Sequence, residues 1–153
     1  RIWTQLDPLD RRDPLVAARA ASRAAANGAA DEARGWLRPF WDRLAELSTD
    51  ERGALALALA DAVQGLGVEW LPKLEASAQA YAREPAVVYA VGMALAERQL
   101  WGKARRLLEE AASDAALPSA VRRKAWLTLA RIASEDGDAA RAERAYESAA
   151  ILA

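Results

Sequence analysis

The residues of this chain that could do acid–base chemistry are neighbouring carboxylates. Adjacent acidic pairs occur at Asp31-Glu32, Asp50-Glu51 and Glu109-Glu110. General acid–base catalysis needs carboxyl groups that face one reacting bond. Each pair falls in a segment with helical periodicity, where consecutive side chains diverge around the axis. We therefore expect these carboxylates to be solvated on helix surfaces, and we predict no catalytic residue among them.

The chain of 153 residues contains no histidine and no cysteine. Histidine is the commonest general base and metal ligand, and cysteine supplies thiol nucleophiles and zinc sites. Both common protein ligands of haem iron are also missing, which leaves Met93 and three tyrosines as the remaining candidates. Neither a glycine-rich phosphate loop nor a nucleophile elbow occurs. The sequence therefore predicts a protein that is not an enzyme and that binds no metal or cofactor.

The charge balance and the apolar segments bear on the partners. The net charge of −1 offers no general basic field to a phosphate backbone, so we expect no nucleic-acid partner. The longest apolar passage, residues 54–63, is interrupted by Asp61 and is shorter than the roughly 18 residues that a membrane span needs. Because the chain begins with Arg1 rather than methionine, we expect it to be part of a longer protein.

Two stretches near the C-terminus repeat each other with a period of 38 residues. The residues Gly92, Ala104, Leu108 and Ala111 correspond to Ala130, Ala142, Tyr146 and Ala149. This spacing of small and large residues is typical of the tetratricopeptide repeat, a helix–turn–helix unit of about 34 residues. The second copy also begins with Trp126 and Leu129, which match the W-x2-L start of that repeat. The pattern predicts stacked pairs of antiparallel helices.

The same register predicts an all-α fold, a tetratricopeptide-like α-solenoid of about four helix pairs in one domain, residues 1–153. Asp13-Pro14 and Glu84-Pro85 each begin a helix, since proline is tolerated in the first helical turn. The helices are expected at 14–27, 30–46, 49–65, 68–83, 85–98, 101–115, 119–136 and 139–152. They form repeats at 14–46, 49–83, 85–115 and 119–152, of which the second departs most from the pattern.

A partner-binding groove can be projected from this register. In tetratricopeptide repeats the first helix of each pair lines the concave face. The projected groove residues are Leu55, Leu59, Tyr89, Met93, Lys124, Leu127 and Arg131. They predict an apolar floor with cations at one end, which suits a peptide with an acidic side chain or a C-terminal carboxylate. The alternative is that Lys124 and Arg131 are ordinary solvated charges.

The aromatic residues have a structural and a functional interpretation. We expect Trp101 to open a helix and pack over the preceding turn, with a surface contact to a partner as the alternative. Trp36, Phe40 and Trp41 form an aromatic helix face that we assign to the core between repeats, with a surface patch for an upstream domain as the alternative. Trp126 is assigned to the core, and Trp3 is expected to dock onto the first helix pair.

The segment Arg98-Gln99-Leu100-Trp101-Gly102-Lys103-Ala104 resembles the HemY-type tetratricopeptide proteins of proteobacteria. The resemblance continues through Glu84-Pro85, Gly92, residues 107–109 and residues 126–150, and more loosely through Asp13-Pro14 and Gly28. These are inner-membrane proteins associated with haem and protoporphyrin biosynthesis, in which two transmembrane helices precede the repeats. The resemblance implies a soluble repeat region, tethered to the inner membrane and facing the cytoplasm. It brings no catalytic residue with it.

Three functions follow from these observations. The leading hypothesis is a non-catalytic scaffold that binds a protein partner, such as an enzyme of tetrapyrrole synthesis. The alternative is a tetrapyrrole-binding or carrier domain that uses the apolar groove, with arginines for the porphyrin propionates. Self-association is the third, because Ile151 and Leu152 end the chain without a capping helix.

Overall fold

The structure is a computed structural model that describes residues 12–153, and Trp3 lies outside this part of the chain. Within it the predicted all-α class is confirmed, since the regular elements are eight α-helices and two short 3-10 turns. The helices are α2 (Pro14–Ala26), α3 (Ala30–Trp41), α4 (Thr49–Asp61), α5 (Leu71–Ala80), α6 (Pro85–Glu97), α7 (Trp101–Ala112), α8 (Ser119–Glu135) and α9 (Ala139–Ile151). The 3-10 turns are η2 (Leu44–Glu46) and η3 (Val68–Trp70).

Local capping fixes where the helices begin. Asp13 accepts a hydrogen bond from the backbone N–H of Leu15, and Pro14 follows it as the first residue of α2. Ser48 and Glu51 form a capping box, in which each side chain accepts from the backbone N–H of the other residue. This box starts α4 at Thr49.

The turns contain glycines in the left-handed backbone conformation, as expected, and one glutamine in that conformation, which was not expected. Gly28 and Gly137 have φ values of +83° and +73°, at turns where glycine was expected. The turn between α6 and α7 uses Gln99 instead, at φ +60°. The sequence does not predict this conformation at Gln99, because glutamine rarely adopts a positive φ, whereas glycine and asparagine do so more often.

Three helices are shorter than their predicted ranges by at least four residues. The segment 30–46 divides into α3, which ends at Trp41, and η2. The segment 68–83 begins as η3 and becomes α-helical from Leu71 to Ala80. α4 ends at Asp61 rather than at residue 65. Here the carbonyls of Ala62 and Gln64 accept hydrogen bonds of 2.7 Å and 2.6 Å from the buried guanidinium of Arg34 on α3. These carbonyls are therefore bonded to α3 instead of continuing the helix.

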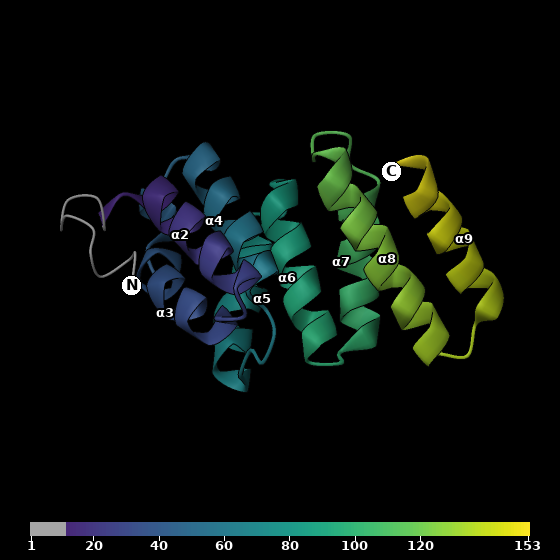
Figure 1. Ribbon diagram of the computed structural model, residues 1–153. Coiled ribbons are helices and arrows are strands. Elements are labelled where there is room, and N and C mark those ends of the chain that lie inside the picture. The colour runs from purple at the N-terminus through teal and green to yellow at the C-terminus, as the bar shows by residue number, and fades with distance from the viewer. Residues whose placement is uncertain (1–11) are drawn as a thin grey trace.

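The helices follow one another along the long axis of the molecule, from α2 and α3 at one end to α9 at the other (Figure 1). α2 packs on both α3 and α4, and α4 packs on α6. Towards the C-terminus, α6 contacts α7, α7 contacts α8, and α8 contacts α9. α6 also touches α8, so α2, α4, α6 and α8 form a continuous series of contacts.

The repeated small residues lie in the core. Ala104, Ala111, Ala130, Ala142 and Ala149 are all buried. Gly92 lies so close to α7 that a Cβ atom on it would be 2.9 Å from Cγ and Cδ2 of Leu108. The exception is Tyr146, the counterpart of Leu108, which is 51% exposed on α9. The repeat register therefore marks the positions where helices approach closely.

Candidate partner-binding surface

Side chains from four helices meet around Asp61, the last residue of α4. Its Oδ2 atom accepts a hydrogen bond of 3.2 Å from Ser22 Oγ on α2. Its Oδ1 atom lies 3.6 Å from Lys124 Nζ on α8. A second contact joins α8 to α6, where Thr128 Oγ1 lies 3.5 Å from Met93 Sδ. α2, α4, α6 and α8 thus present polar and apolar groups to one side of the molecule.

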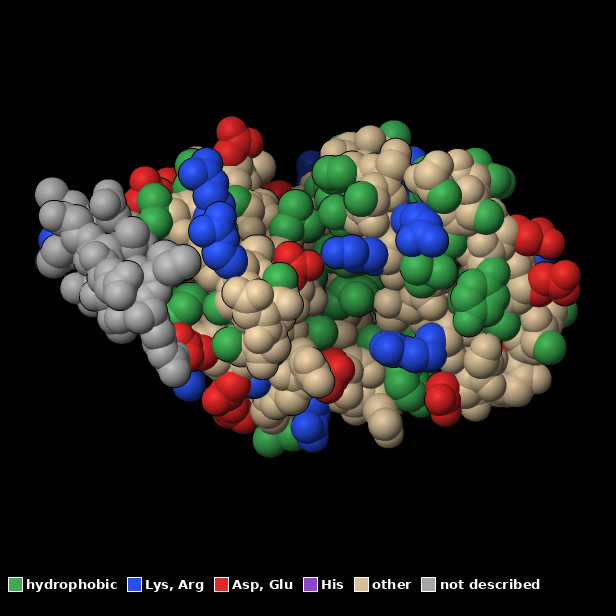
Figure 2. Space-filling model, viewed as in Figure 1, with side chains coloured by type: hydrophobic (Ala, Val, Ile, Leu, Met, Phe, Trp, Pro, Cys, Tyr) green, Lys and Arg blue, Asp and Glu red, His purple; other side chains and the backbone are tan. Residues whose placement is uncertain are grey.

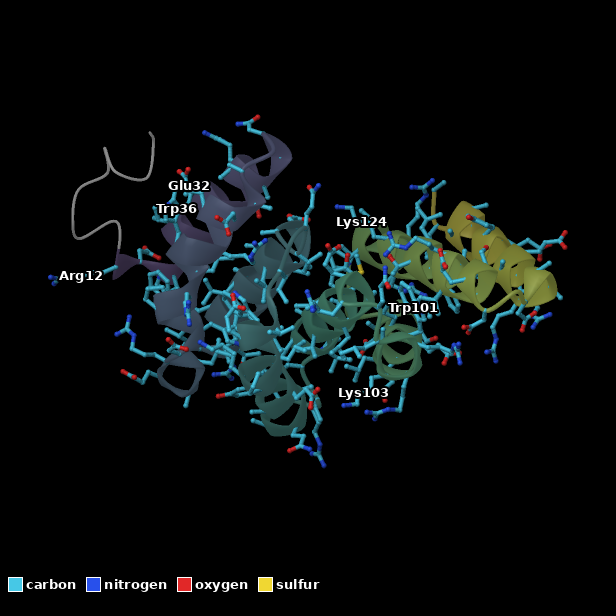
Figure 3. All side chains as sticks on the ribbon, turned by 90° about the horizontal axis from the view of Figure 1, so that it is seen from below. Arg12, Glu32, Trp36, Trp101, Lys103 and Lys124 are labelled. Carbon is cyan, nitrogen blue, oxygen red and sulfur yellow. The ribbon has the colours of Figure 1, made fainter. Side chains whose placement is uncertain are left out.

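The spacing of residues on α8 extends this surface. Leu127 and Arg131 lie three and seven residues after Lys124, so they fall on the same side of the helix. We call the surface made by Ser22, Asp61, Met93, Lys124, Leu127 and Arg131 the Asp61 face, and Thr128 is buried next to it. Lys124 and Lys103 project from opposite sides of the molecule (Figure 3). The space-filling view has a hollow near its middle, with hydrophobic side chains below and charged ones at the edge (Figure 2).

The electrostatics of the Asp61 face combine an open ion pair with a buried phenol. The side chains of Lys124 and Asp61 are 58% and 40% exposed. An exposed pair of this kind contributes only about 0–1 kcal/mol, so either partner can exchange it for another contact. Tyr89 on α6 is buried close by, and burial together with the Asp61 carboxylate raises the pKa of Tyr89 to about 12.

The structure separates the seven predicted groove residues into two groups. Lys124 and Arg131 are exposed, and Met93 and Leu127 are partly buried on the Asp61 face. The prediction was wrong for Leu55 and Leu59, which are fully buried in the core. Tyr89 is also buried, at 3% exposure, so it supports the face from below instead of forming an open floor.

The error at α4 is one of register. The capping box starts α4 at Thr49, whereas α6 starts at Pro85. Counted from these first residues, Leu57 and Asp61 occupy the positions of Met93 and Glu97. Leu55 and Leu59 therefore point into the core. Asp61 carried a sequence signal, because it interrupts the apolar run 54–63, whereas Ser22 and Thr128 carried none.

The aromatic residues serve mainly as packing groups. Phe40 and Trp41 are buried, and Trp41 Nε1 donates a hydrogen bond of 3.1 Å to Ser77 Oγ on α5. Trp36, Trp101 and Trp126 are partly buried and pack against the core. The structural interpretation of Trp101 is thus supported by its packing, and a partner contact there stays a prediction.

The side chains of the acidic pairs either make local contacts or line separate pockets. Asp31 forms an ion pair of 3.1 Å with Arg34, and the Glu51 carboxylate accepts from the backbone N–H of Ser48. Glu109 and Glu110 line two different pockets. Within residues 12–153, no three acidic side chains gather into a group that could hold a metal ion.

No helix in the described part of the chain has both the length and the hydrophobicity for a membrane span. Comparison with protein-family models, with curated proteins and with solved structures finds no match for this chain.

Proposed function

We propose that this chain is a non-catalytic helical-repeat scaffold that binds a segment of a protein partner on the Asp61 face. The observation that carries the proposal is that Ser22 on α2 and Lys124 on α8 both contact Asp61 on α4, while α8 also contacts Met93 on α6. A surface that is assembled from one helix of each successive pair suits an extended or helical peptide better than a small substrate.

The architecture that we propose is a tetratricopeptide-like solenoid. Two features support it: the continuous series of contacts from α2 to α8, and the burial of the small residues that recur with the 38-residue period. In such a solenoid the first helices of the pairs line one face and the second helices line the other.

The chemistry of the Asp61 face favours an acidic or C-terminal segment of the partner. Lys124 and Arg131 are exposed, and Arg19 lies one turn before Ser22 on α2. Among the residues that define the Asp61 face, Lys124 and Arg131 are cations and Asp61 is the one carboxylate. Met93 and Leu127 offer adjoining apolar surface. A carboxylate of the partner would replace Asp61 on Lys124 and form a charge-assisted hydrogen bond there.

The biological setting that we propose is haem biosynthesis at the inner membrane, with an enzyme of tetrapyrrole synthesis as the partner. It rests on the resemblance of residues 98–104 to the HemY-type proteins. The tetrapyrrole-carrier alternative gains no support, because the apolar floor on which it depended consists largely of the buried residues Leu55, Leu59 and Tyr89.

An affinity pull-down from membranes with the full-length protein tests this proposal. The variant Lys124→Glu/Arg131→Glu reverses two charges on the Asp61 face. The matched control Lys103→Glu/Arg106→Glu makes the same two charge changes on α7, with Lys103 on the opposite side of the molecule (Figure 3). We expect the wild type and the control to recover tetrapyrrole enzymes equally, and the variant to lose at least about tenfold of that recovery.

Two outcomes would contradict the proposal. Equal recovery by the two double variants would move the contact away from the Asp61 face. Recovery of no tetrapyrrole enzyme by any of the three proteins would remove the proposed setting.

A further inference from the structure

Two pockets repeat along the chain between consecutive second helices of the pairs. The α5–α7 pocket has a volume of about 390 Å³ and is lined by α5, α6 and α7. The α7–α9 pocket has a volume of about 300 Å³ and is lined by α7, α8 and α9. Their lining residues correspond with the same period of 38, so that Lys103 and Arg106 of the first pocket become Arg141 and Arg144 of the second. The repeat therefore places a basic pair on one wall of both pockets.

The basic pair of the α5–α7 pocket is neutralised by acidic residues. Lys103 Nζ lies 3.3 Å from Glu75 Oε1, across the pocket on α5. Glu110 lines the same pocket beside Arg106. Two cations therefore face two carboxylates, and this pocket offers no net charge to a ligand.

The α7–α9 pocket is built in the same way, but a neutral residue replaces the acidic Glu110. Ser148 stands at the position equivalent to Glu110, and the opposite wall carries Arg105. Three arginines therefore line this pocket, with Glu109 as the one acidic residue among its lining side chains. Within residues 12–153, Arg141 and Arg144 belong to none of the ion pairs that the structure contains.

Arg105 adds a buried donor to this wall. Its Nη2 atom pairs with Asp136 at the end of α8. Its Nε atom is buried and has no hydrogen-bond acceptor among the described residues. Leaving such a donor unpaired costs free energy, on the order of 1–3 kcal/mol.

The floor of the α7–α9 pocket is apolar and aromatic. The floor residues of the α5–α7 pocket, Val88 and Val91, are replaced by Trp126 and Leu129. The partly buried indole of Trp126 offers a flat surface beside the guanidinium groups. Planar groups pack well on such rings, and guanidinium binds carboxylate and phosphate in bidentate fashion.

We propose that the α7–α9 pocket is a binding site for an aromatic oxyanion. The carboxylate or phosphate group of the ligand contacts Arg141 and Arg144, and its flat apolar body packs on Trp126. The site is independent of the Asp61 face, since none of its lining residues belongs to that face.

Calorimetric titration of the chain with four small probes tests this site. Phenyl phosphate and phenylacetate carry the two oxyanions on an aromatic ring. Inorganic phosphate lacks the ring, and benzylamine carries the opposite charge. We expect saturable binding of one or both aromatic anions, at least about tenfold weaker binding of inorganic phosphate, and none of benzylamine. The stronger of the two aromatic anions identifies the headgroup.

Charge variants locate the binding. Arg141→Gln/Arg144→Gln is expected to weaken the aromatic anion at least about tenfold, whereas Lys103→Gln/Arg106→Gln in the equivalent pocket leaves it within about twofold. Glu109→Gln removes the acidic lining residue and is expected to tighten binding, a gain that a damaged fold would not produce. Circular dichroism checks that each variant is folded.

Three results would overturn the proposal. The first is the absence of saturable binding by both aromatic anions. The second is an equal loss of affinity in Arg141→Gln/Arg144→Gln and in Lys103→Gln/Arg106→Gln. The third is equal affinity for inorganic phosphate and for the stronger of the two aromatic anions.

Discussion

At the scale of single residues, Asp61 links the surface of the protein to its core. Its carboxylate accepts from Ser22, pairs with the exposed Lys124 and lies close enough to the buried Tyr89 to act on its phenol. The negative charge of Asp61 therefore disfavours ionisation of the Tyr89 phenol. This effect should be visible in the dependence of stability on pH.

We predict that Tyr89 makes stability fall at high pH. Because its folded pKa is about 12, above the usual 10.0, its contribution is complete below pH 10 and is lost as the pH rises towards 12. Over this range the free energy of unfolding of the wild type should fall more than that of Tyr89→Phe, by on the order of 2 kcal/mol. Urea unfolding between pH 9 and pH 12 measures both curves.

The exposed Tyr146 provides the control for that comparison. Tyr146→Phe makes the same chemical change at a half-exposed position on α9, so its curve shows what the loss of a phenol does away from Asp61. If the curve of Tyr89→Phe runs parallel to that of the wild type, then the burial and the neighbouring carboxylate do not act on Tyr89 as described.

At the scale of the elements, the closest approach is that of α6 and α7 at Gly92. The small residue at this position brings the helix axis near Leu108, which is fully buried. In the next repeat the equivalent residues are Ala130 and Tyr146, and the tyrosine is half exposed. The tight contact therefore lies between α6 and α7, which have neighbouring helices on both sides along the chain.

We predict that Gly92→Ala destabilises the protein despite the higher helix propensity of alanine. The new Cβ would lie 2.9 Å from Leu108 Cγ and 3.3 Å from Leu107 Cβ, so the Leu108 side chain or α7 must shift. Overpacking of this kind costs about 1–3 kcal/mol. Gly102→Ala is the matched control, because nothing lies within 4 Å of a Cβ there. Its stability in thermal unfolding should stay unchanged or rise by up to about 1 kcal/mol. A loss of stability in the control equal to that in Gly92→Ala would count against the contact as the cause.

The elements also show how far the sequence can predict this molecule. Helix starts were predictable because Pro14, Pro85 and the Ser48 cap are local signals. The early end of α4 was not, because it depends on Arg34, which is distant in sequence and buried. A two-residue shift in the register of α4 then assigned Leu55 and Leu59 to the surface in place of Leu57 and Asp61. Side-chain direction in a helix changes with every residue, so small register errors displace a predicted site.

At the scale of the whole molecule, alternate helices supply two different surfaces. The first helices of the pairs supply the Asp61 face, and the second helices supply the walls of the two pockets. Sequence divergence between the repeats then distinguishes equivalent sites, as the exchange of Glu110 for Ser148 does. Tyr146 and Ile151 remain exposed on α9, and self-association through this end stays a prediction.

The most direct test of the central claim is photo-crosslinking in membranes that contain the full-length protein. A photoreactive amino acid is placed either at Arg131, on the Asp61 face, or at Arg106, in the wall of the α5–α7 pocket. Both positions are exposed, so both probes can reach a bound protein. Our account predicts a specific protein adduct from position 131 and none of the same mass from position 106. An adduct from position 106 with none from position 131 would contradict it.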